Sequence, residues 1–416
     1  MSRPSINKSR ESISYLKRLL IVISITVVIL AFVTARFIPR LTSLSSQLIP
    51  FAGLAKMSTS TSAYTKELLV AQLAVQRASI LTKTVFHQNT KGTLSKDDAS
   101  PVTIGDFGAQ ALIISAIKAA FPEDEVVGEE EASSLRENSR LRDQIWELVQ
   151  AAKLSDSNAE QELGGPIKTV DAMLDAIDAG NSAGGAKGRI WALDPIDGTK
   201  GFLRGGQYAV CLALMVDGDV KVGVLGCPNL PVDDKAPLDA NIGADQTDSE
   251  GKGVLFSAVQ GQGATSRPLT SAGLDKNSSK ISVSHVEDLT QATFCESVEA
   301  GHSSHGDQHD IATKLGIKKP SVRMDSQAKY GSLARGAGDI YLRLPVRADY
   351  QEKIWDHAAG DLIVREAGGE VTDTLGRRLD FSHGRTLKEN KGVVAAPAAI
   401  HGRVLEVVKE VLAKKK

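Results

Sequence analysis

The segment RIWALDPIDGTKGF, residues 189–202, constrains the fold more than any other part of the chain. Its apolar first half predicts a β-strand, which is expected to stop at DPIDG because proline and glycine favour a turn. Asp194 and Asp197 would then leave the sheet at one edge. Two carboxylates about 4 Å apart repel by roughly 4 kcal/mol at an effective dielectric constant of 20. The segment therefore predicts a cation between them.

The residues around the two aspartates indicate which cation this is. Ligands that are all oxygen suit a hard ion such as Mg²⁺, and the Ile196 carbonyl could supply one more oxygen. Gly198 permits close backbone approach, and Thr199 places a hydroxyl at the start of a following helix, where N–H groups favour an anion. The alternative is an acidic turn without a ligand.

Three further segments end an apolar run with an acid. VTIGD supplies Asp106 at the expected start of a helix over 106–121, and VVGEE supplies Glu129 and Glu130 after a short strand. WDHAAG supplies Asp356 at the start of another helix, where it could act only as an N-cap. Taken together, the four segments predict strand and helix ends that converge to hold several metal ions.

The order of apolar patterns indicates the architecture. A hairpin is expected over 208–228 with its turn at Asp217-Gly218. Strands near 254–259, 281–284 and 340–344 alternate with helices near 307–315, 355–367 and 398–413, which predicts a layered α/β sandwich. Residues 131–188 predict a peripheral segment that contains helices. The polar stretch 231–253 suggests a boundary between an N-terminal metal-binding α+β lobe, 57–235, and a C-terminal α/β lobe with substrate contacts, 236–416.

The N-terminal extension, residues 1–56, is a separate problem. Leu19 to Ala35 are 17 residues without a charge, preceded by basic residues. As a helix this run spans about 25 Å, close to the roughly 30 Å of a membrane core. We expect a transmembrane or organelle-targeting segment over 19–38, with a mitochondrial presequence as the alternative. Membrane contact is expected through this segment only, and a start or cleavage near Met57 would release a soluble form.

Charge and cysteine content exclude several classes of protein. Lys and Arg number 49 and Asp and Glu 50, a net charge of −1, so we expect no nucleic-acid partner. The three cysteines have no CxxC spacing, which suits a reduced compartment. We therefore expect a cytoplasmic catalytic domain, and a monomeric one.

Three motifs together resemble the lithium-sensitive, magnesium-dependent phosphatases of the inositol monophosphatase family. They are W-x-L-D-P-I-D-G-T-x-x-F at 191–202, W-D-x-A-A-G at 355–360 and G-E-E at 128–130, and the resemblance spans roughly residues 64–412. It implies the αβαβα sandwich of this family and of the sugar phosphatases. FLRGGQYAV, VEAGHSSHGDQ and RMDSQAKYG are similar to its fungal and plant branch, which acts on nucleoside 3′(2′),5′-bisphosphates.

The resemblance also implies roles for single residues. Two or three Mg²⁺ ions would be held by Glu129, Asp194, Ile196, Asp197 and Asp356. Asp106 and Thr199 would orient the attacking water. The nucleotide would be bound by Gly198, Thr199, His302, Ser326, Lys329, Arg343 and Asp356.

The implied reaction removes the 3′(2′)-phosphate of 3′-phosphoadenosine 5′-phosphate, or of its 5′-phosphosulfate analogue, in sulfate assimilation. It would be inhibited by Li⁺. The alternative enzymes are an inositol polyphosphate 1-phosphatase and an inositol monophosphatase. A further alternative is that the protein is not an enzyme but a membrane-tethered nucleotide-binding regulator.

Overall fold

The computed structural model describes residues 63–90, 100–233, 238, 251–299, 301, 303–344, 346–347 and 349–414. The expected segment 19–38, Met57 and His302 lie outside these residues. The chain divides into two compact units, Met1–Ser60 and Thr61–Lys416. All elements described below belong to the second unit.

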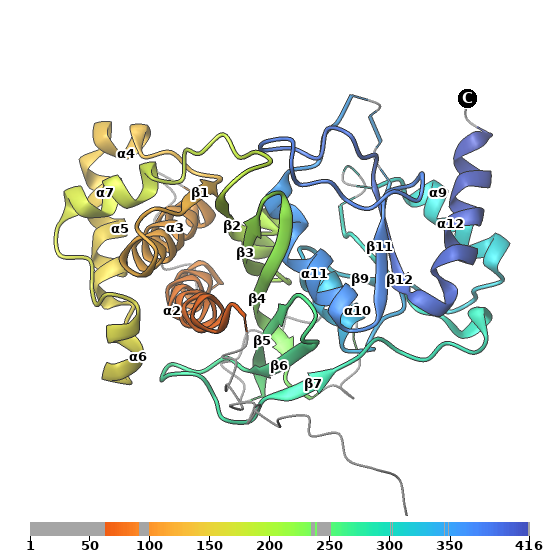
Figure 1. Ribbon diagram of the computed structural model, residues 1–416, viewed down its shortest axis with the longest axis horizontal. Helices are drawn as coiled ribbons and strands as arrows, with labels where there is room; N and C mark the ends of the chain where they lie inside the picture. The colour runs from red at the N-terminus through yellow and green to blue at the C-terminus, as the bar shows by residue number, and fades with distance from the viewer. Residues whose placement is uncertain are drawn as a thin grey trace, which may run out of the picture. The chain divides into compact units, whose positions relative to one another are not determined.

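The larger of two sheets in this unit has seven strands, which lie side by side in chain order (Figure 1). β1 and β2 are parallel and all later neighbours are antiparallel. The expected hairpin is β3 and β4, and Asp217 and Gly218 both have positive φ, as a two-residue hairpin turn requires. The strands are β1 (Glu125–Gly128), β2 (Arg189–Asp197), β3 (Ala209–Val216), β4 (Asp219–Pro231), β5 (Lys252–Val259), β6 (Ala264–Pro268) and β7 (Ser279–Ile281).

A second, mixed sheet of five strands has the order β11-β12-β10-β8-β9. β10 is parallel to β8 and antiparallel to β12. Its strands are β8 (Phe294–Glu296), β9 (Val322–Arg323), β10 (Ile340–Arg343), β11 (Gly369–Thr372) and β12 (Val393–Pro397).

Helices separate and cover the two sheets, which gives five layers (Figure 1). α2 (Thr65–Thr90) and α3 (Pro101–Ala120) cover one face of the first sheet and share a buried core with it. α10 (Ala328–Ala334) and α11 (Ala358–Glu366) lie between the sheets, and their core includes side chains of both. α9 (His305–Leu315) and α12 (Ala398–Ala413) cover the outer face of the second sheet. The predicted αβαβα sandwich is confirmed.

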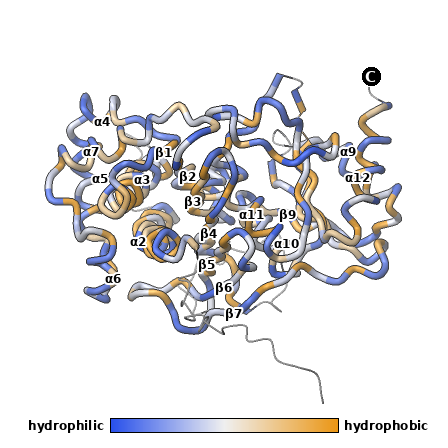
Figure 2. Tube along the Cα trace, in the orientation of Figure 1, coloured by the Kyte–Doolittle hydropathy of each residue, from blue (hydrophilic) through white to orange (hydrophobic). Residues whose placement is uncertain are grey.

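Shorter helices complete the unit. The expected peripheral segment over 131–188 holds α4 (Ser133–Glu137), α5 (Ser139–Ala151), α6 (Ser157–Glu162) and α7 (Val170–Asp178). The others are α8 (Thr199–Arg204) and two 3₁₀ turns, η1 (Leu289–Gln291) and η2 (Ile354–Asp356). Figure 2 shows apolar residues along α3 and the central strands, while the outer helices alternate polar and apolar positions.

The structure differs from the sequence-based expectations in three places. α3 begins at Pro101, because Ser100 caps it by accepting the Thr103 N–H, so Asp106 lies inside the helix and not at its start. β2 does not stop at Asp194 but continues to Asp197, with a shift in register after Asp194. The first sheet also continues to Ile281, across the expected boundary at 235/236, because the polar stretch there connects two neighbouring antiparallel strands, β4 and β5.

Among the described residues, one stretch is long and apolar enough to cross a bilayer, Val102–Ala120 of α3. Most of it is buried, packed between the first sheet and neighbouring helices.

Candidate active site

The two aspartates lie at the end of β2, and the turn that follows them requires a positive φ, which glycine adopts most easily. Gly198 has φ 89° and leads into α8, which Thr199 begins. A Cβ on Gly198 would lie 2.9 Å from the Ser326 Cβ, so the absence of a side chain lets β2 approach the loop before α10. The close approach expected at Gly198 is confirmed, and it brings Ser326 beside the aspartates.

A cavity of about 320 Å³ opens at this point. Its walls come from the ends of β1, β2 and β10, the start of α8, the loop before α10, and η2. The residues expected from the sequence that line it are Glu129, Asp194, Ile196, Asp197, Gly198, Thr199, Ser326, Lys329, Arg343 and Asp356. Three of the four acidic segments expected to converge, those of Glu129, of Asp194 and Asp197, and of Asp356, therefore meet at this cavity.

Neighbouring acids raise the pKa of three carboxylates in this cavity, of which Asp194 is buried, Asp356 half-buried and Glu129 exposed. Burial, Glu129 and Asp197 raise the pKa of Asp194 well above its ordinary value, and burial and Asp197 do the same for Asp356. Burial, Glu130 and Asp197 raise the pKa of Glu129 to about 7. Each carboxylate is thus costly to ionise in the absence of a counter-charge.

The donor set fits a hard divalent cation. Asp194 Oδ1 is buried and has no hydrogen-bond partner among the described residues, which is a costly arrangement for a carboxylate oxygen unless a cation binds it. The surrounding ligand atoms are carboxylate and carbonyl oxygens, the atoms that Mg²⁺ prefers.

Asp106 does not line the cavity. It is buried behind the β2 turn, where its carboxyl group accepts a hydrogen bond from the Ile196 backbone N–H. Burial, Glu130 and Glu129 raise its pKa well above the ordinary value. Thr199, the other residue expected to orient water, lies in the cavity wall.

Two cationic side chains, Lys329 and Arg343, also line the cavity. The Lys329 Nζ is buried, donates to the Ser326 carbonyl at 3.0 Å, and has a pKa that burial lowers to about 8 despite the attraction of Asp197. The Arg343 Nε donates to Glu352 Oε1 at 3.0 Å, which holds the guanidinium in the wall. The cavity is therefore lined by both acidic and basic side chains, as expected for a cation and an anion bound together.

A comparison with known families decides what kind of protein this is. The model of the inositol monophosphatase family matches residues 64–413. The chain belongs to the inositol monophosphatase family. The membership expected from the three sequence motifs is confirmed.

Two similar proteins in this family are named 3′(2′),5′-bisphosphate nucleotidase. The one from Emericella nidulans is 66% identical over 349 residues, which cover 84% of this chain and 99% of that protein. The one from Schizosaccharomyces pombe is 49% identical, over 84% of this chain and 96% of that protein. Among solved structures, an inositol monophosphatase from Zymomonas mobilis is 18% identical with a TM-score of 0.51, covering 84% of this chain and 99% of that one. This likeness supports the fold.

Other residues of this family member's site could not be recognised in the sequence. The cavity is also lined by Lys200, Ser297, Asp325, Tyr341 and Tyr350. Lys200 belongs to α8 and Tyr341 to β10, and the other three lie in loops. Position inside a recognised motif is a signal for two of them, Lys200 beside Thr199 and Asp325 beside Ser326.

A buried network supports the WD motif from behind. Ligand atoms of Glu352, Asp356 and His357 lie within 4.8 Å of one another. Tyr330 and His357 share a hydrogen bond of 2.8 Å, and Glu352 binds both Arg343 and His357. Because Glu352 and His357 already have these partners, we assign them to supporting the site and not to an additional metal centre.

Proposed function

We propose that this chain is a metal-dependent 3′(2′),5′-bisphosphate nucleotidase. It would hydrolyse 3′-phosphoadenosine 5′-phosphate to AMP and phosphate, and the 5′-phosphosulfate analogue to adenosine 5′-phosphosulfate. The observation that carries the proposal is one cavity lined both by several carboxylates and by Lys329 and Arg343. The names of the relatives at 66% and 49% identity support the same substrate class.

The proposed cofactor is Mg²⁺, in two or three ions held by Glu129, Asp194, Asp197, Asp356 and the Ile196 carbonyl. When bound, such ions supply positive charge that polarises the phosphoryl group and lowers the pKa of water. This chemistry is needed because phosphate monoesters require up to about 10²¹-fold acceleration. General acid–base catalysis contributes only about 10²- to 10⁴-fold.

The chain's own residues then have distinct tasks. Asp106 acts from behind the cavity, where its hydrogen bond fixes the Ile196 backbone. Thr199, in the cavity wall, orients the water whose oxygen attacks phosphorus, and Asp106 contributes to that orientation through the backbone it holds. The bond from phosphorus to the 3′ oxygen breaks, and that oxygen takes up the proton that the attacking water gives up. Ser326, Lys329 and Arg343 bind the remaining nucleoside 5′-phosphate, because cationic side chains pair with phosphate oxygens. His302 is proposed as a further nucleotide contact.

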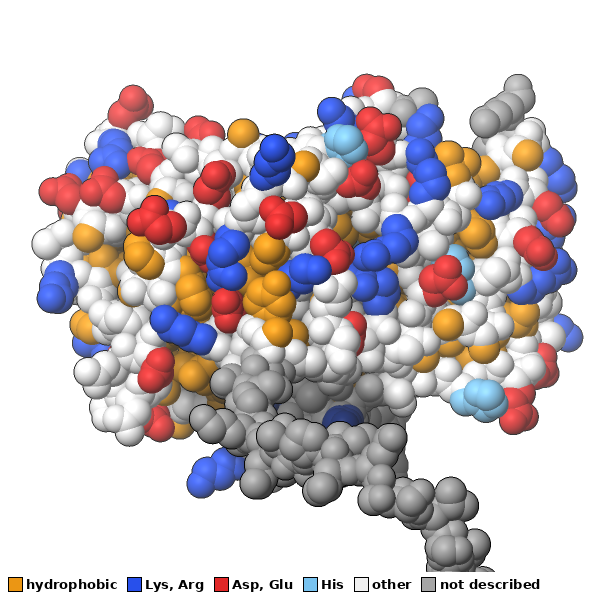
Figure 3. Space-filling view, viewed as in Figure 1, with side chains coloured by type: hydrophobic (Ala, Val, Ile, Leu, Met, Phe, Trp, Pro, Cys, Tyr) orange, Lys and Arg blue, Asp and Glu red, His pale blue; other side chains and the backbone are white. Residues whose placement is uncertain are grey.

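The biological setting belongs to the same proposal. The substrates place the reaction in sulfate assimilation, and Li⁺ is proposed as an inhibitor that competes for a magnesium position. The three cysteines, Cys211, Cys227 and Cys295, are buried and free, which supports a reduced, cytoplasmic setting. The catalytic unit is proposed to be monomeric. The face in Figure 3 intersperses acidic and basic side chains, which gives no support to nucleic acid as a partner.

The test is a phosphate-release assay on the full-length chain with Mg²⁺, comparing 3′-phosphoadenosine 5′-phosphate with inositol 1-phosphate and inositol 1,4-bisphosphate. We expect a higher kcat/KM for the nucleotide and inhibition by added Li⁺. Faster release from an inositol phosphate would replace the proposal by one of the alternative enzymes. Nucleotide binding without phosphate release would favour the regulator.

A further inference from the structure

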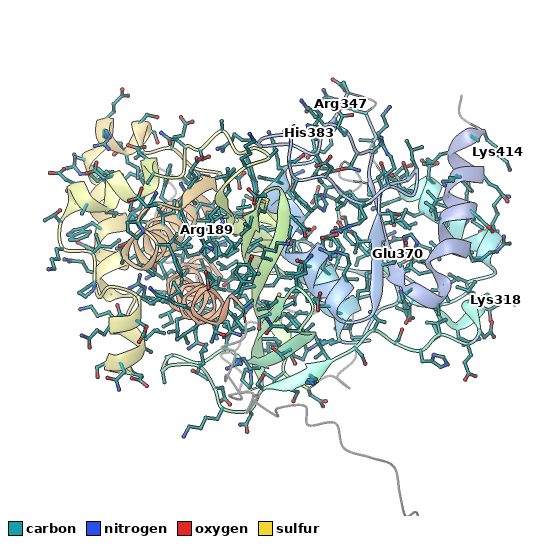
Figure 4. All side chains as sticks on the ribbon, viewed as in Figure 1. Arg189, Lys318, Arg347, Glu370, His383 and Lys414 are labelled. Carbon is teal, nitrogen blue, oxygen red and sulfur yellow. The ribbon has the colours of Figure 1, made fainter. Side chains whose placement is uncertain are left out.

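The connection between β11 and β12, residues 373–392, reaches from the second sheet to the first. Gly384 packs so closely on Gly184 that a Cβ on Gly184 would lie 2.9 Å from its backbone. Ser382 lies equally close to Gly218, in the turn of the β3–β4 hairpin. In the view of Figure 4, His383 lies toward the top of the molecule, above the strands of the two sheets. This connection therefore bridges elements that the layers otherwise keep apart.

Arg385 extends from this connection toward the end of β1. Its Nη2 donates to the Gly128 carbonyl at 2.5 Å and its Nη1 to the Ser182 carbonyl at 2.9 Å. The 180–182 segment itself pairs with the edge of β1, because Ser182 N–H donates to the Val126 carbonyl. One guanidinium thus holds the last residue of β1 and the strand edge beside it.

The same side chain also contacts the WD motif. The guanidinium of Arg385 lies over the Trp355 ring, 4.9 Å from its centroid, and the Arg385 carbonyl accepts the Ile354 N–H. The neighbouring Leu387 N–H donates to the Glu352 carbonyl. The connection and the loop before η2 are therefore joined by backbone hydrogen bonds as well as by this stacking.

These two sets of contacts flank two carboxylates of the cavity. Gly128 directly precedes Glu129, and Trp355 directly precedes Asp356. We propose that Arg385 is a positioning residue that sets the spacing of Glu129 and Asp356 and so the affinity of the site for Mg²⁺. This inference rests on the proposed function. A lysine could not replace it, because only the planar guanidinium donates to two carbonyls and stacks on an indole at the same time.

The experiment measures Mg²⁺ binding to the full-length chain by isothermal titration calorimetry, without substrate. Arg385→Lys keeps the positive charge but removes the planar guanidinium and its paired N–H donors. Arg378→Lys is the matched control, since Arg378 is exposed and lies on the same connection. Loss of a residue that supports metal ligands typically weakens metal affinity about 10- to 100-fold. We expect a loss in this range for Arg385→Lys and less than about twofold for the control, with the unfolding midpoint in EDTA nearly unchanged for both.

Steady-state assays provide a second readout. At limiting Mg²⁺ we expect lower activity for Arg385→Lys, and at saturating Mg²⁺ a nucleotide KM close to that of the unchanged chain. Mg²⁺ affinity within twofold of the unchanged chain would overturn the proposal. So would loss of cooperative unfolding in EDTA, which would make Arg385 a determinant of folding. Because the titration uses no substrate, it remains decisive even if the nucleotide is not hydrolysed.

Discussion

The backbone N–H of Gln327 donates a hydrogen bond to the Asp197 carboxylate at 2.5 Å, although the two residues are 130 positions apart in the chain. The buried side-chain amide of Gln327 also donates to the Trp355 carbonyl and accepts the Gly360 N–H. One residue thus joins the DPIDG turn to the WD motif.

Replacing Gln327 by alanine should destabilise the protein. The substitution leaves the Trp355 carbonyl and the Gly360 N–H buried without their partner, at about 1–3 kcal/mol each. We expect the free energy of unfolding in urea to fall by roughly 2–5 kcal/mol. Gln291→Ala, at an exposed position, is the control and should change it by less than about 0.5 kcal/mol. Equal changes in the free energy of unfolding for the two variants would show that the hydrogen bonds of the Gln327 side chain do not contribute to stability.

Asp194→Asn should abolish turnover and leave the fold intact. The amide keeps the shape of the side chain but removes a charge that binds the metal, whose contribution of several kcal/mol corresponds to about 10³-fold or more in kcat. Without metal the variant should unfold at or above the temperature of the unchanged chain, because a buried carboxylate with a raised pKa is lost. Asp143→Asn, at an exposed helical position, should retain activity. Near-normal activity of Asp194→Asn in saturating Mg²⁺ would refute the metal role.

Stability without metal should fall as the pH rises. Burial, Glu130 and Asp197 raise the pKa of Glu129 from 4.5 to about 7, so the folded state binds a proton that the unfolded state has released. The stabilisation is complete below pH 4.5 and is lost through pH 7. Asp194 and Asp356 shift in the same direction.

Thermal unfolding in EDTA between pH 5 and pH 8 checks this sign. The unfolding temperature should decrease with pH. Mg²⁺ should raise it more at pH 8 than at pH 5, since ionised ligands bind the ion more strongly. If Mg²⁺ raised the unfolding temperature by the same amount at both pH values, the assignment of these carboxylates as ligands would be contradicted.

Nucleotide binding should weaken above about pH 8. Burial lowers the pKa of Lys329 to about 8, so its positive charge is lost at alkaline pH and with it the attraction for phosphate oxygens. We expect the KM for the nucleotide to rise above that pH. Lys329→Met should have a higher KM at neutral pH and no such alkaline rise. A KM of the unchanged chain that stays constant from pH 7 to pH 9.5 would exclude this role.

Much of the architecture could be predicted because its signals are local. The alternation around Asp217-Gly218 specifies a hairpin, and the apolar periods of 307–315 and 398–413 specify helices. The expected lobe boundary at 235/236 does not follow the first sheet, because a polar insertion between neighbouring strands has the same composition as a linker. The start of α3 was placed too late, since an acid after an apolar run resembles an N-cap as much as Ser100 before Pro101 does.

The sequence by itself determined the carboxylates and the chemistry they favour, since Asp194 and Asp197 share one short turn and Glu129 and Asp356 each follow an apolar run. Only the tertiary structure decided which side chains lie next to these carboxylates and hold them in position. Glu352 holds Arg343, Gln327 joins two motifs, and Arg385 reaches β1 from a connection 257 positions away. Such contacts depend on where the chain returns in space, because hydrogen bonds and burial act over a few ångströms and leave no periodic trace along the sequence.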